Sequence, residues 1–177
     1  MSSTSRPAVV LLSGGLDSSV ITALMASEMS QPVKTFSIGF AGMPDNELAA
    51  ARETANALGA AAHKTVVVDL RSIGGSALTD DIDVPETGGP GIPVTYVPAR
   101  NTIMLSIALG WAEVLGAADL FCGVNAVDYS GYPDCRPEFI AAFDALANVA
   151  TKAGVEGAGI RVHAHLLRRG GRDTDRH

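Results

Sequence analysis

The sequence predicts an α/β fold built on a parallel five-stranded sheet with helices on both faces. Short apolar, β-branched segments alternate along the chain with longer segments of helical pattern, which is the order of βαβ units. The first such segment, 8–12, is apolar throughout and so indicates a strand buried on both faces. The chain has 177 residues, of which 47% are hydrophobic, enough for one core. We expect a single domain over 1–167 that is truncated at its C-terminus, followed by a disordered basic tail over 168–177.

The other elements are expected in the same alternation. A helix should follow the loop 13–19 and end near Glu28. Apolar residues recur at helical spacing over 46–58, and Gly59 is the expected stop. Residues 101–115 are apolar almost all round, which indicates a buried helix. The remaining expected elements are strands at 34–38 and 64–68, a long Gly- and Pro-rich loop with one helical turn at 69–98, a strand at 119–122, a polar loop at 123–135, a helix from Pro137 to about Gly154 and a strand at 160–167.

Three loops directly follow strands: Ser13–Ser19, Gly39–Asp45 and Gly123–Cys135. The carboxyl ends of parallel strands lie at one edge of a sheet, and ligands of such sheets bind there. We therefore expect the three loops to meet around one cleft.

The loop Ser13-Gly-Gly-Leu-Asp-Ser18 lies between the first strand and the first helix. Its glycines let the backbone turn sharply and approach a ligand closely, and the helix directs free N–H groups and its positive dipole end at the loop. A multiply charged anion is the expected ligand. The loop lacks the Walker A lysine and the GxGxxG spacing, which disfavours γ-phosphoryl transfer and dinucleotide binding. The structural alternative is a glycine turn whose Ser and Asp merely cap a helix.

The pattern SGGxDS resembles the PP-loop signature of the N-type ATP pyrophosphatases. That resemblance implies ATP as cofactor, with pyrophosphate leaving while the α-phosphorus is attacked, and Asp17 as a catalytic residue that helps to hold Mg²⁺. The residues expected to contact the nucleotide are Leu12, Ser13, Gly14, Gly15, Leu16, Asp17, Ser18, Ser19, Val20, Ile21 and Thr22.

Two further resemblances divide the chain. Segments 12–20 and 33–40 look like the synthetase domain of asparagine synthetase, whereas Tyr96-Val-Pro-Ala-Arg-Asn-Thr102 and the segment from Gly123 to Phe139 look like the 7-cyano-7-deazaguanine synthases of the queuosine pathway. The last segment is long, polar and unusual, so it decides the substrate. The resemblance implies that 7-carboxy-7-deazaguanine, ammonia and ATP give the nitrile by two successive adenylations, first of the carboxylate and then of the amide.

The same resemblance implies roles for single residues. Arg100 is expected to act in catalysis by pairing with the substrate carboxylate or the α-phosphate, with a structural ion pair as the alternative. Asn101 is interpreted as a helix cap. The residues expected to contact the purine-like substrate, in addition to Arg100, are Asn125, Asp128, Tyr129, Tyr132 and Asp134.

The cysteines and histidines receive structural interpretations. Cys135 is expected to be a packed thiol rather than a nucleophile, because ammonia attacks directly, and Cys122 a core residue. His163 and His165 alternate on the last strand, but two histidines are not a metal site without further ligands.

Two features depart from the deazaguanine family. Segment 37–40 replaces an Asp-Tyr-Gly-Gln-type sequence near the expected cleft. The family also ends in a four-cysteine zinc site, and this chain has no cysteine after Cys135. We therefore expect no bound structural zinc, and we assign no cluster of metal-ligating residues to this chain.

Charge and hydropathy limit the partners. The net charge is −6, and four of the 13 basic residues lie in the last ten positions, which disfavours nucleic acid as partner. No apolar segment reaches the length of a membrane span, and no signal peptide is evident. A cytoplasmic enzyme is expected, and the resemblance implies a homodimer. The alternatives are an asparagine-synthetase-like amidation of a small carboxylate and an inactive ATP-binding remnant.

Overall fold

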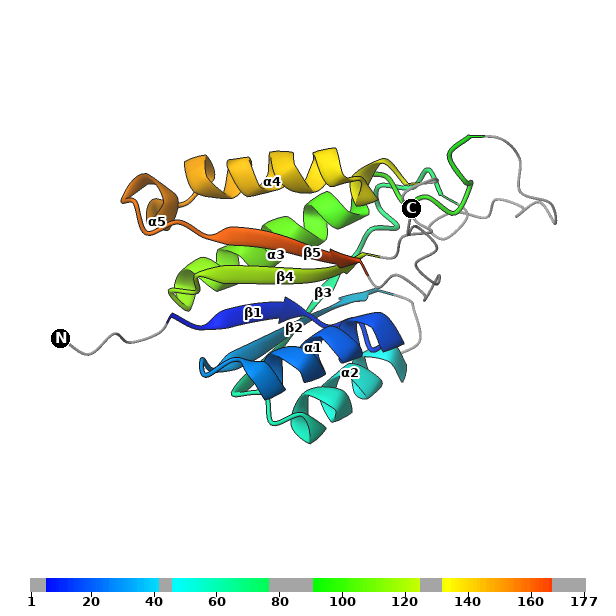
Figure 1. Cartoon of the computed structure of the whole chain (residues 1–177). Coiled ribbons are helices and arrows are strands. Elements are labelled where there is room, and N and C mark those ends of the chain that lie inside the picture. The colour runs from blue at the N-terminus through cyan, green and yellow to red at the C-terminus, as the bar shows by residue number, and fades with distance from the viewer. Residues whose placement is uncertain (1–5, 42–45, 77–90, 125–131, 167–177) are drawn as a thin grey trace, which may run out of the picture.

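A computed structural model describes residues 6–41, 46–76, 91–124 and 132–166 of the chain. It contains a five-stranded sheet in the order β3-β2-β1-β4-β5, and all four neighbouring pairs are parallel. The predicted fold class is therefore confirmed, and all strand arrows in Figure 1 point the same way. The strands are β1 (Ala8–Leu11), β2 (Val33–Phe40), β3 (Ala62–Val68), β4 (Asp119–Val124) and β5 (Arg161–Leu166).

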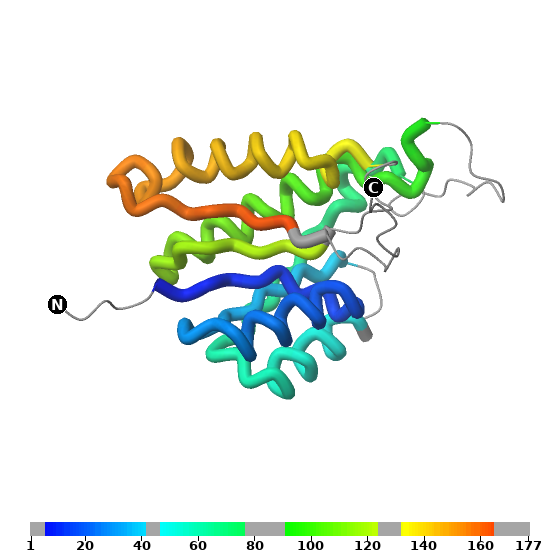
Figure 2. Tube along the Cα trace, viewed as in Figure 1, coloured from blue at the N-terminus to red at the C-terminus, as the bar shows by residue number. Residues whose placement is uncertain are grey.

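Helices cover both faces of this sheet. Helices α1 and α2 lie on one side, and α3 and α4 lie on the other; the trace in Figure 2 shows the same layers. The helices are α1 (Leu16–Glu28), α2 (Asn46–Ala57), α3 (Arg100–Val114), α4 (Pro137–Ala150) and the single turn α5 (Lys152–Val155), with a short 3₁₀ helix, η2 (Pro133–Cys135), before α4.

The central strand β1 explains why its segment is apolar at every position. Successive side chains of a strand point to opposite faces. Ala8 and Val10 pack with Ile21 and Met25 of α1, whereas Val9 belongs to the cluster formed with α3 and α4. Both faces of β1 are therefore covered, as the sequence predicted.

The helix expected from Pro137 to about Gly154 is interrupted at Thr151. The backbone of Thr151 is extended, with φ −116° and ψ 150°. Its hydroxyl accepts a hydrogen bond from the Gly154 N–H at 3.0 Å and donates to the Ala147 carbonyl at 2.7 Å. Thr151 thus ends α4 and caps α5. Threonine is suited to this position because its hydroxyl can bond backbone groups that the helix leaves unpaired at its ends. The expectation of one continuous helix was wrong.

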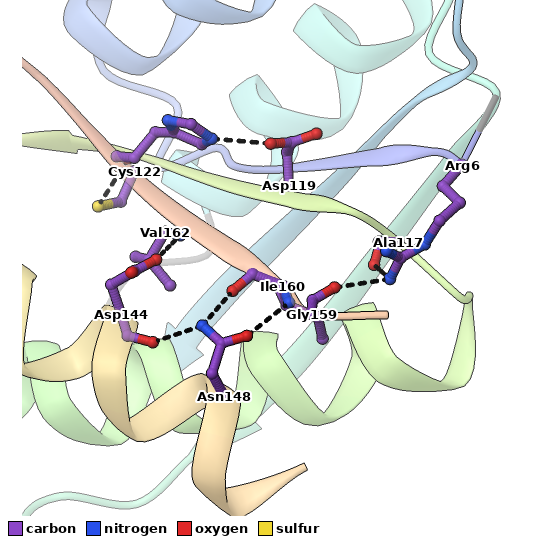
Figure 3. Close-up of polar contacts among 10 residues, drawn as sticks. Arg6, Ala117, Asp119, Cys122, Asp144, Asn148, Gly159, Ile160 and Val162 are labelled. Atoms are coloured by element: carbon purple, nitrogen blue, oxygen red, sulfur yellow. Dashed lines mark hydrogen bonds and ion pairs between the residues drawn. The ribbon is translucent and has the colours of Figure 1, made fainter. Parts of the chain in front are cut away.

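Polar side chains of α4 satisfy backbone groups at the start of the edge strand β5 (Figure 3). Asn148 donates to the Ile160 carbonyl at 3.1 Å and accepts from the Ile160 N–H at 3.2 Å. Asp144 accepts from the Val162 N–H at 2.7 Å. These bonds cover part of an edge that would otherwise present unpaired backbone groups. The tail predicted over 168–177 lies outside the described residues.

No helix among the described residues has the length and apolar character needed to cross a membrane.

Arg6 joins the start of β1 to two chain reversals at the same end of the sheet. Its guanidinium donates to the carbonyls of Gly116 at 3.0 Å and Gly159 at 2.8 Å, and also to those of Ala117 and Ala158. Figure 3 shows Arg6 directed at Ala117 and Gly159. One planar cation therefore holds the turn after α3 and the turn before β5 against β1.

We predict that Arg6→Ala lowers the free energy of unfolding by about 2 kcal/mol, because hydrogen bonds from a charged donor contribute more than neutral ones. Urea unfolding followed by circular dichroism measures this. The matched control is Arg71→Ala, which removes an exposed arginine whose contact with Asp69 is an exposed ion pair; it should change stability by less than about 0.5 kcal/mol. Equal effects of the two variants would contradict the role of Arg6.

Candidate functional site

A cavity of about 360 Å³ opens at the carboxyl end of the sheet, a volume within the range of small-molecule sites. The first and third predicted loops contribute to its lining, with Ser13, Gly15 and Ser18 from the first and Tyr132, Asp134 and Cys135 from the third. Phe40 and Gly123 also line the cavity, but they belong to β2 and β4. Residues 42–45 of the second predicted loop lie outside the described residues, so the meeting of the loops is confirmed for the first and third only.

The first loop turns at Gly14. Its φ is +82°, and a Cβ there would lie 2.5 Å from the carbonyl oxygen of Glu47 in α2. Glycine is thus needed both for the backbone conformation and for the close approach of α2. Gly15 differs, because its φ of −79° suits any residue, and a Cβ there would meet the Ser13 hydroxyl at 3.3 Å.

Helix α1 begins inside the loop, at Leu16, with Gly15 as its N-cap and no side-chain cap. The first intrahelical bond runs from the Ser19 N–H to the Gly15 carbonyl at 3.2 Å. The N–H groups of the preceding turn therefore have no acceptor within the helix, and they lie at its positive dipole end. This is the arrangement that binds phosphate in other proteins.

Hydroxyl groups stiffen the same loop. The hydroxyls of Ser13 and Ser18 lie 2.9 Å apart, and the Ser18 hydroxyl also accepts from the Ser13 N–H at 3.1 Å. The Ser19 hydroxyl donates to the Gly15 carbonyl at 2.8 Å. Gly123 of β4 passes close by, since a Cβ on it would lie 3.6 Å from the Ser18 nitrogen. A side chain at residue 123 would thus lie over the first turn of α1.

Arg100 and Asn101 form part of the cavity wall at the start of α3. Among the described residues no carboxylate forms an ion pair with Arg100, so the structural ion pair considered as its alternative role is not seen there. Asn101 does not cap the helix, and that interpretation was wrong. The N-cap is Ala99, in a left-handed conformation with φ 53°, which costs about 1 kcal/mol in a residue other than glycine.

The capping acceptor comes instead from Asp134 in η2. One carboxylate oxygen of Asp134 accepts from the Asn101 N–H at 2.9 Å. The Asn101 amide returns two hydrogen bonds, to the Asp134 carbonyl at 2.9 Å and to Cys135 Sγ at 3.1 Å. Asp134 is only 7% exposed, so its carboxylate is committed to this contact.

The tyrosine rings expected to bind the substrate are described in part. Tyr132 lines the cavity, stacks on Tyr96 with 6.0 Å between ring centroids, and shares a hydrogen bond of 3.0 Å with Thr95. Asn125, Asp128 and Tyr129 lie outside the described residues.

Several residues predicted to contact the nucleotide have side chains that do not line the cavity or that are also packed in the core. Asp17 is half-buried in the first turn of α1 and is not part of the cavity lining. Ile21 belongs to the core, and Thr22 is fully buried, donating to the Ser18 carbonyl at 2.7 Å. Leu12 lines the cavity but also packs against α2.

Sequence reasoning missed the apolar part of the wall and one acidic residue. Phe36, Ile38 and Phe40 are contributed by β2, Met104 and Leu105 by α3, Ile140 by α4, and Glu47 by α2. Ile38 and Phe40 belong to segment 37–40, where we expected a departure from the deazaguanine family, so that segment contributes to the cavity wall. The alternation along β2 was the available signal, because residues 36, 38 and 40 share one face.

Both cysteines are buried, are not joined in a disulfide and line the cavity. Burial raises the pKa of Cys122 to about 12, with a smaller contribution from nearby Cys135. Cys122 is part of the core, as predicted.

His163 has partners, as interpreted. His163 contacts Asp119 at 2.8 Å and stacks on Phe121, with 4.4 Å between ring centroids. The side chain of His165 is outside what the structure describes. Within the described ranges, no group of three or more His, Cys, Asp or Glu side chains is placed to hold a metal ion.

Comparison with known proteins gives a consistent result. The family described as "Queuosine biosynthesis protein QueC" matches residues 7–174. The chain is 72% identical over 161 residues to a 7-cyano-7-deazaguanine synthase of Stenotrophomonas maltophilia strain R551-3, covering 91% of this chain and 72% of that protein. The corresponding protein of Xanthomonas oryzae pv. oryzae strain PXO99A is 70% identical over 161 residues, with 91% and 71% covered.

Among solved structures, a predicted tRNA methyltransferase subunit from Methanocaldococcus jannaschii is similar in fold. The TM-score is 0.55 at 21% sequence identity, and the match covers 93% of this chain and 70% of that chain.

We predict that Gly14→Ala destabilises the protein by about 3 kcal/mol, because it combines an unfavourable φ with a backbone clash. Gly59→Ala is the matched control: its φ is +68°, but nothing lies within 4 Å of the added carbon, so only about 1 kcal/mol is expected. Thermal and urea unfolding measure both. If the two substitutions cost the same, the close approach of α2 to Gly14 is not a real constraint.

We also predict that Cys122 resists alkylation in the folded protein. In a Cys135→Ser background at pH 8, iodoacetamide should modify it at least about 100-fold more slowly than in 6 M urea, because the raised pKa leaves little thiolate and burial blocks access. Mass spectrometry of timed samples measures the rate. Rapid modification of the native protein would contradict the placement of Cys122 in the core.

Proposed function

Because the chain belongs to the family of the queuosine biosynthesis protein QueC, we propose that it uses ATP and ammonia to convert 7-carboxy-7-deazaguanine into 7-cyano-7-deazaguanine. The strongest single support in the fold is the cavity that combines the uncapped start of α1 with Arg100 and Tyr132. A helix N-terminus suited to an anion, a guanidinium with no ion pair among the described residues and an aromatic ring suit a nucleotide, a carboxylate and a purine-like base.

The chemistry addresses a poor electrophile. A carboxylate resists attack by ammonia, and transfer of AMP to one of its oxygens, with loss of pyrophosphate, supplies a leaving group. Ammonia then displaces AMP and gives the amide. A second AMP transfer, to the amide oxygen, followed by loss of AMP and a proton, gives the nitrile.

The loop and the cation have complementary tasks in this proposal. The free N–H groups at the start of α1 bind the β- and γ-phosphates, which become the departing pyrophosphate. Arg100 neutralises charge at the α-phosphate or the substrate carboxylate, for which its planar guanidinium is suited. The ring of Tyr132 supplies a stacking surface for the base.

Asp17 is the residue proposed to hold Mg²⁺. It lies in the first turn of α1, next to the N–H groups of the loop, and offers hard carboxylate oxygens. Mg²⁺ commonly binds through one or two carboxylates together with substrate phosphates and water, and Asp17 would supply one such carboxylate. When bound, the ion offsets negative charge on the leaving pyrophosphate.

Ammonia as nitrogen donor, a homodimer and a cytoplasmic location complete the proposal. Two buried cysteines that are not joined in a disulfide are compatible with a reducing compartment. Size-exclusion chromatography with light scattering measures the oligomeric state.

The function is tested by incubating the full chain with ATP, Mg²⁺ and ammonium, with and without 7-carboxy-7-deazaguanine. Pyrophosphate and AMP are expected only in its presence, in a ratio of two pyrophosphates per nitrile formed. Aspartate in place of the deazaguanine is the control substrate. Pyrophosphate release that depends on aspartate would favour amidation of a small carboxylate. ATP binding without pyrophosphate release would favour an inactive ATP-binding remnant.

We predict that Asp17→Ala lowers pyrophosphate release at least about 1,000-fold while the protein remains folded, because the charge of the leaving group is no longer offset through that carboxylate. Raising Mg²⁺ should not restore the rate. The matched control is Glu28→Ala, an exposed carboxylate at the other end of α1, which should retain activity. Turnover of Asp17→Ala near the normal rate would remove Asp17 from the mechanism.

A further inference from the structure

The contact between η2 and α3 has a feature that helix capping alone does not require. The N-cap residue of α3 is Ala99, which has no side-chain acceptor for the first N–H groups and has an unfavourable left-handed backbone. Serine, threonine, asparagine or aspartate normally fills this position. Here the acceptor is Asp134, 33 residues away in the sequence, on a different wall of the cavity.

The contact is reciprocal and buried. The Asn101 N–H donates to the Asp134 carboxylate, while the Asn101 amide donates to the backbone carbonyl of Asp134 and to Cys135. Three hydrogen bonds thus fix the backbone of α3 at the residue next to Arg100. Two further hydrogen bonds hold the backbone next to Arg100. The Arg100 N–H donates to the Val97 carbonyl at 3.2 Å, and the Ala99 N–H donates to the Tyr96 hydroxyl at 3.0 Å.

The charges explain why the capping carboxylate lies on η2 and binds a backbone N–H, instead of contacting the guanidinium of Arg100. Asp134 spends its carboxylate on a backbone N–H and forms no ion pair with Arg100. Within the part of the chain that the structure describes, no carboxylate therefore competes with a ligand for the guanidinium of Arg100. A carboxylate in direct contact with Arg100 would compete with that ligand.

From this geometry we propose that Asp134 is a positioning residue that orients Arg100 toward the anion held at the start of α1, rather than a residue that contacts the substrate. This rests on the proposed function insofar as the anion is the phosphate tail of ATP. Asp134 acts through the first turn of α3, so its removal should misplace Arg100 without removing its charge.

The experiment is a double-mutant cycle between Asp134→Ala and Arg100→Ala, read out as kcat and KM for pyrophosphate release. Each single variant should lower kcat/KM about 100-fold, because a displacement of about 1 Å in a positioning group has effects of that size. The double variant should be no worse than Arg100→Ala within about threefold, since the two residues act as one unit. If the decreases in kcat/KM of the two single variants multiply in the double variant, the proposal is overturned and direct substrate contact by Asp134 is favoured.

Asp134→Asn is the conservative variant. Its amide oxygen can still accept from the Asn101 N–H, so it should recover most of the loss of Asp134→Ala, mainly in kcat. Failure of Asp134→Asn to recover activity, despite a normal melting temperature, would overturn the positioning role. Glu138→Ala is the matched control, because it removes an exposed carboxylate from the first turn of α4 and should leave activity unchanged.

A second measurement does not depend on turnover. In Asp134→Ala, hydrogen exchange at the Asn101 amide should accelerate at least about tenfold and the side-chain Nε–H of Arg100 should become mobile by heteronuclear NMR, whereas Asp134→Asn should behave as the parent protein. Unchanged exchange and mobility would sink the proposal. If the parent protein releases no pyrophosphate, the proposed function fails, and these NMR data still decide whether Asp134 orients Arg100.

Discussion

The turn at Gly14 is the constraint on which the site depends. A left-handed residue there lets β1 end and α1 begin within a few residues, so that Gly15 and the first turn of α1 face the cavity. The same turn lets the carbonyl of Glu47 approach to a distance that no Cβ would tolerate. The close packing of α2 and the proposed anion site therefore depend on the same turn, and α2 helps to hold the loop that we propose to bind the phosphates.

The start of α3, which also lines the cavity, is fixed by a contact with η2 instead of by a glycine turn. Helix α3 lacks a cap of its own and receives one from Asp134, which ties its first turn to η2. Both helix starts thus reach the cavity with backbone groups or a cation available to ligands. Between them lies an apolar wall from β2 and α3, which would exclude water from a reaction that passes through hydrolysable adenylates.

Much of the fold could be predicted from sequence, because buried strands and helices carry their own hydrophobic pattern. The alternation predicted all five strands, and SGGxDS predicted the strand–loop–helix turn that we propose as the anion site. Contacts between distant segments were not accessible in this way. The cap of Asn101 by Asp134, the break at Thr151 and the role of Ile38 in the wall depend on tertiary neighbours. Local propensity carries no information about which distant carboxylate supplies a cap.

The central claim is that AMP is transferred to an oxygen of the substrate carboxylate. The most direct test uses 7-carboxy-7-deazaguanine labelled with ¹⁸O in both carboxylate oxygens, with unlabelled ATP, Mg²⁺ and ammonium, and mass spectrometry of the phosphorus products. The account predicts ¹⁸O in AMP, one atom per molecule, and none in inorganic phosphate or pyrophosphate. Label in inorganic phosphate together with ADP would instead show γ-phosphoryl transfer and would contradict the account.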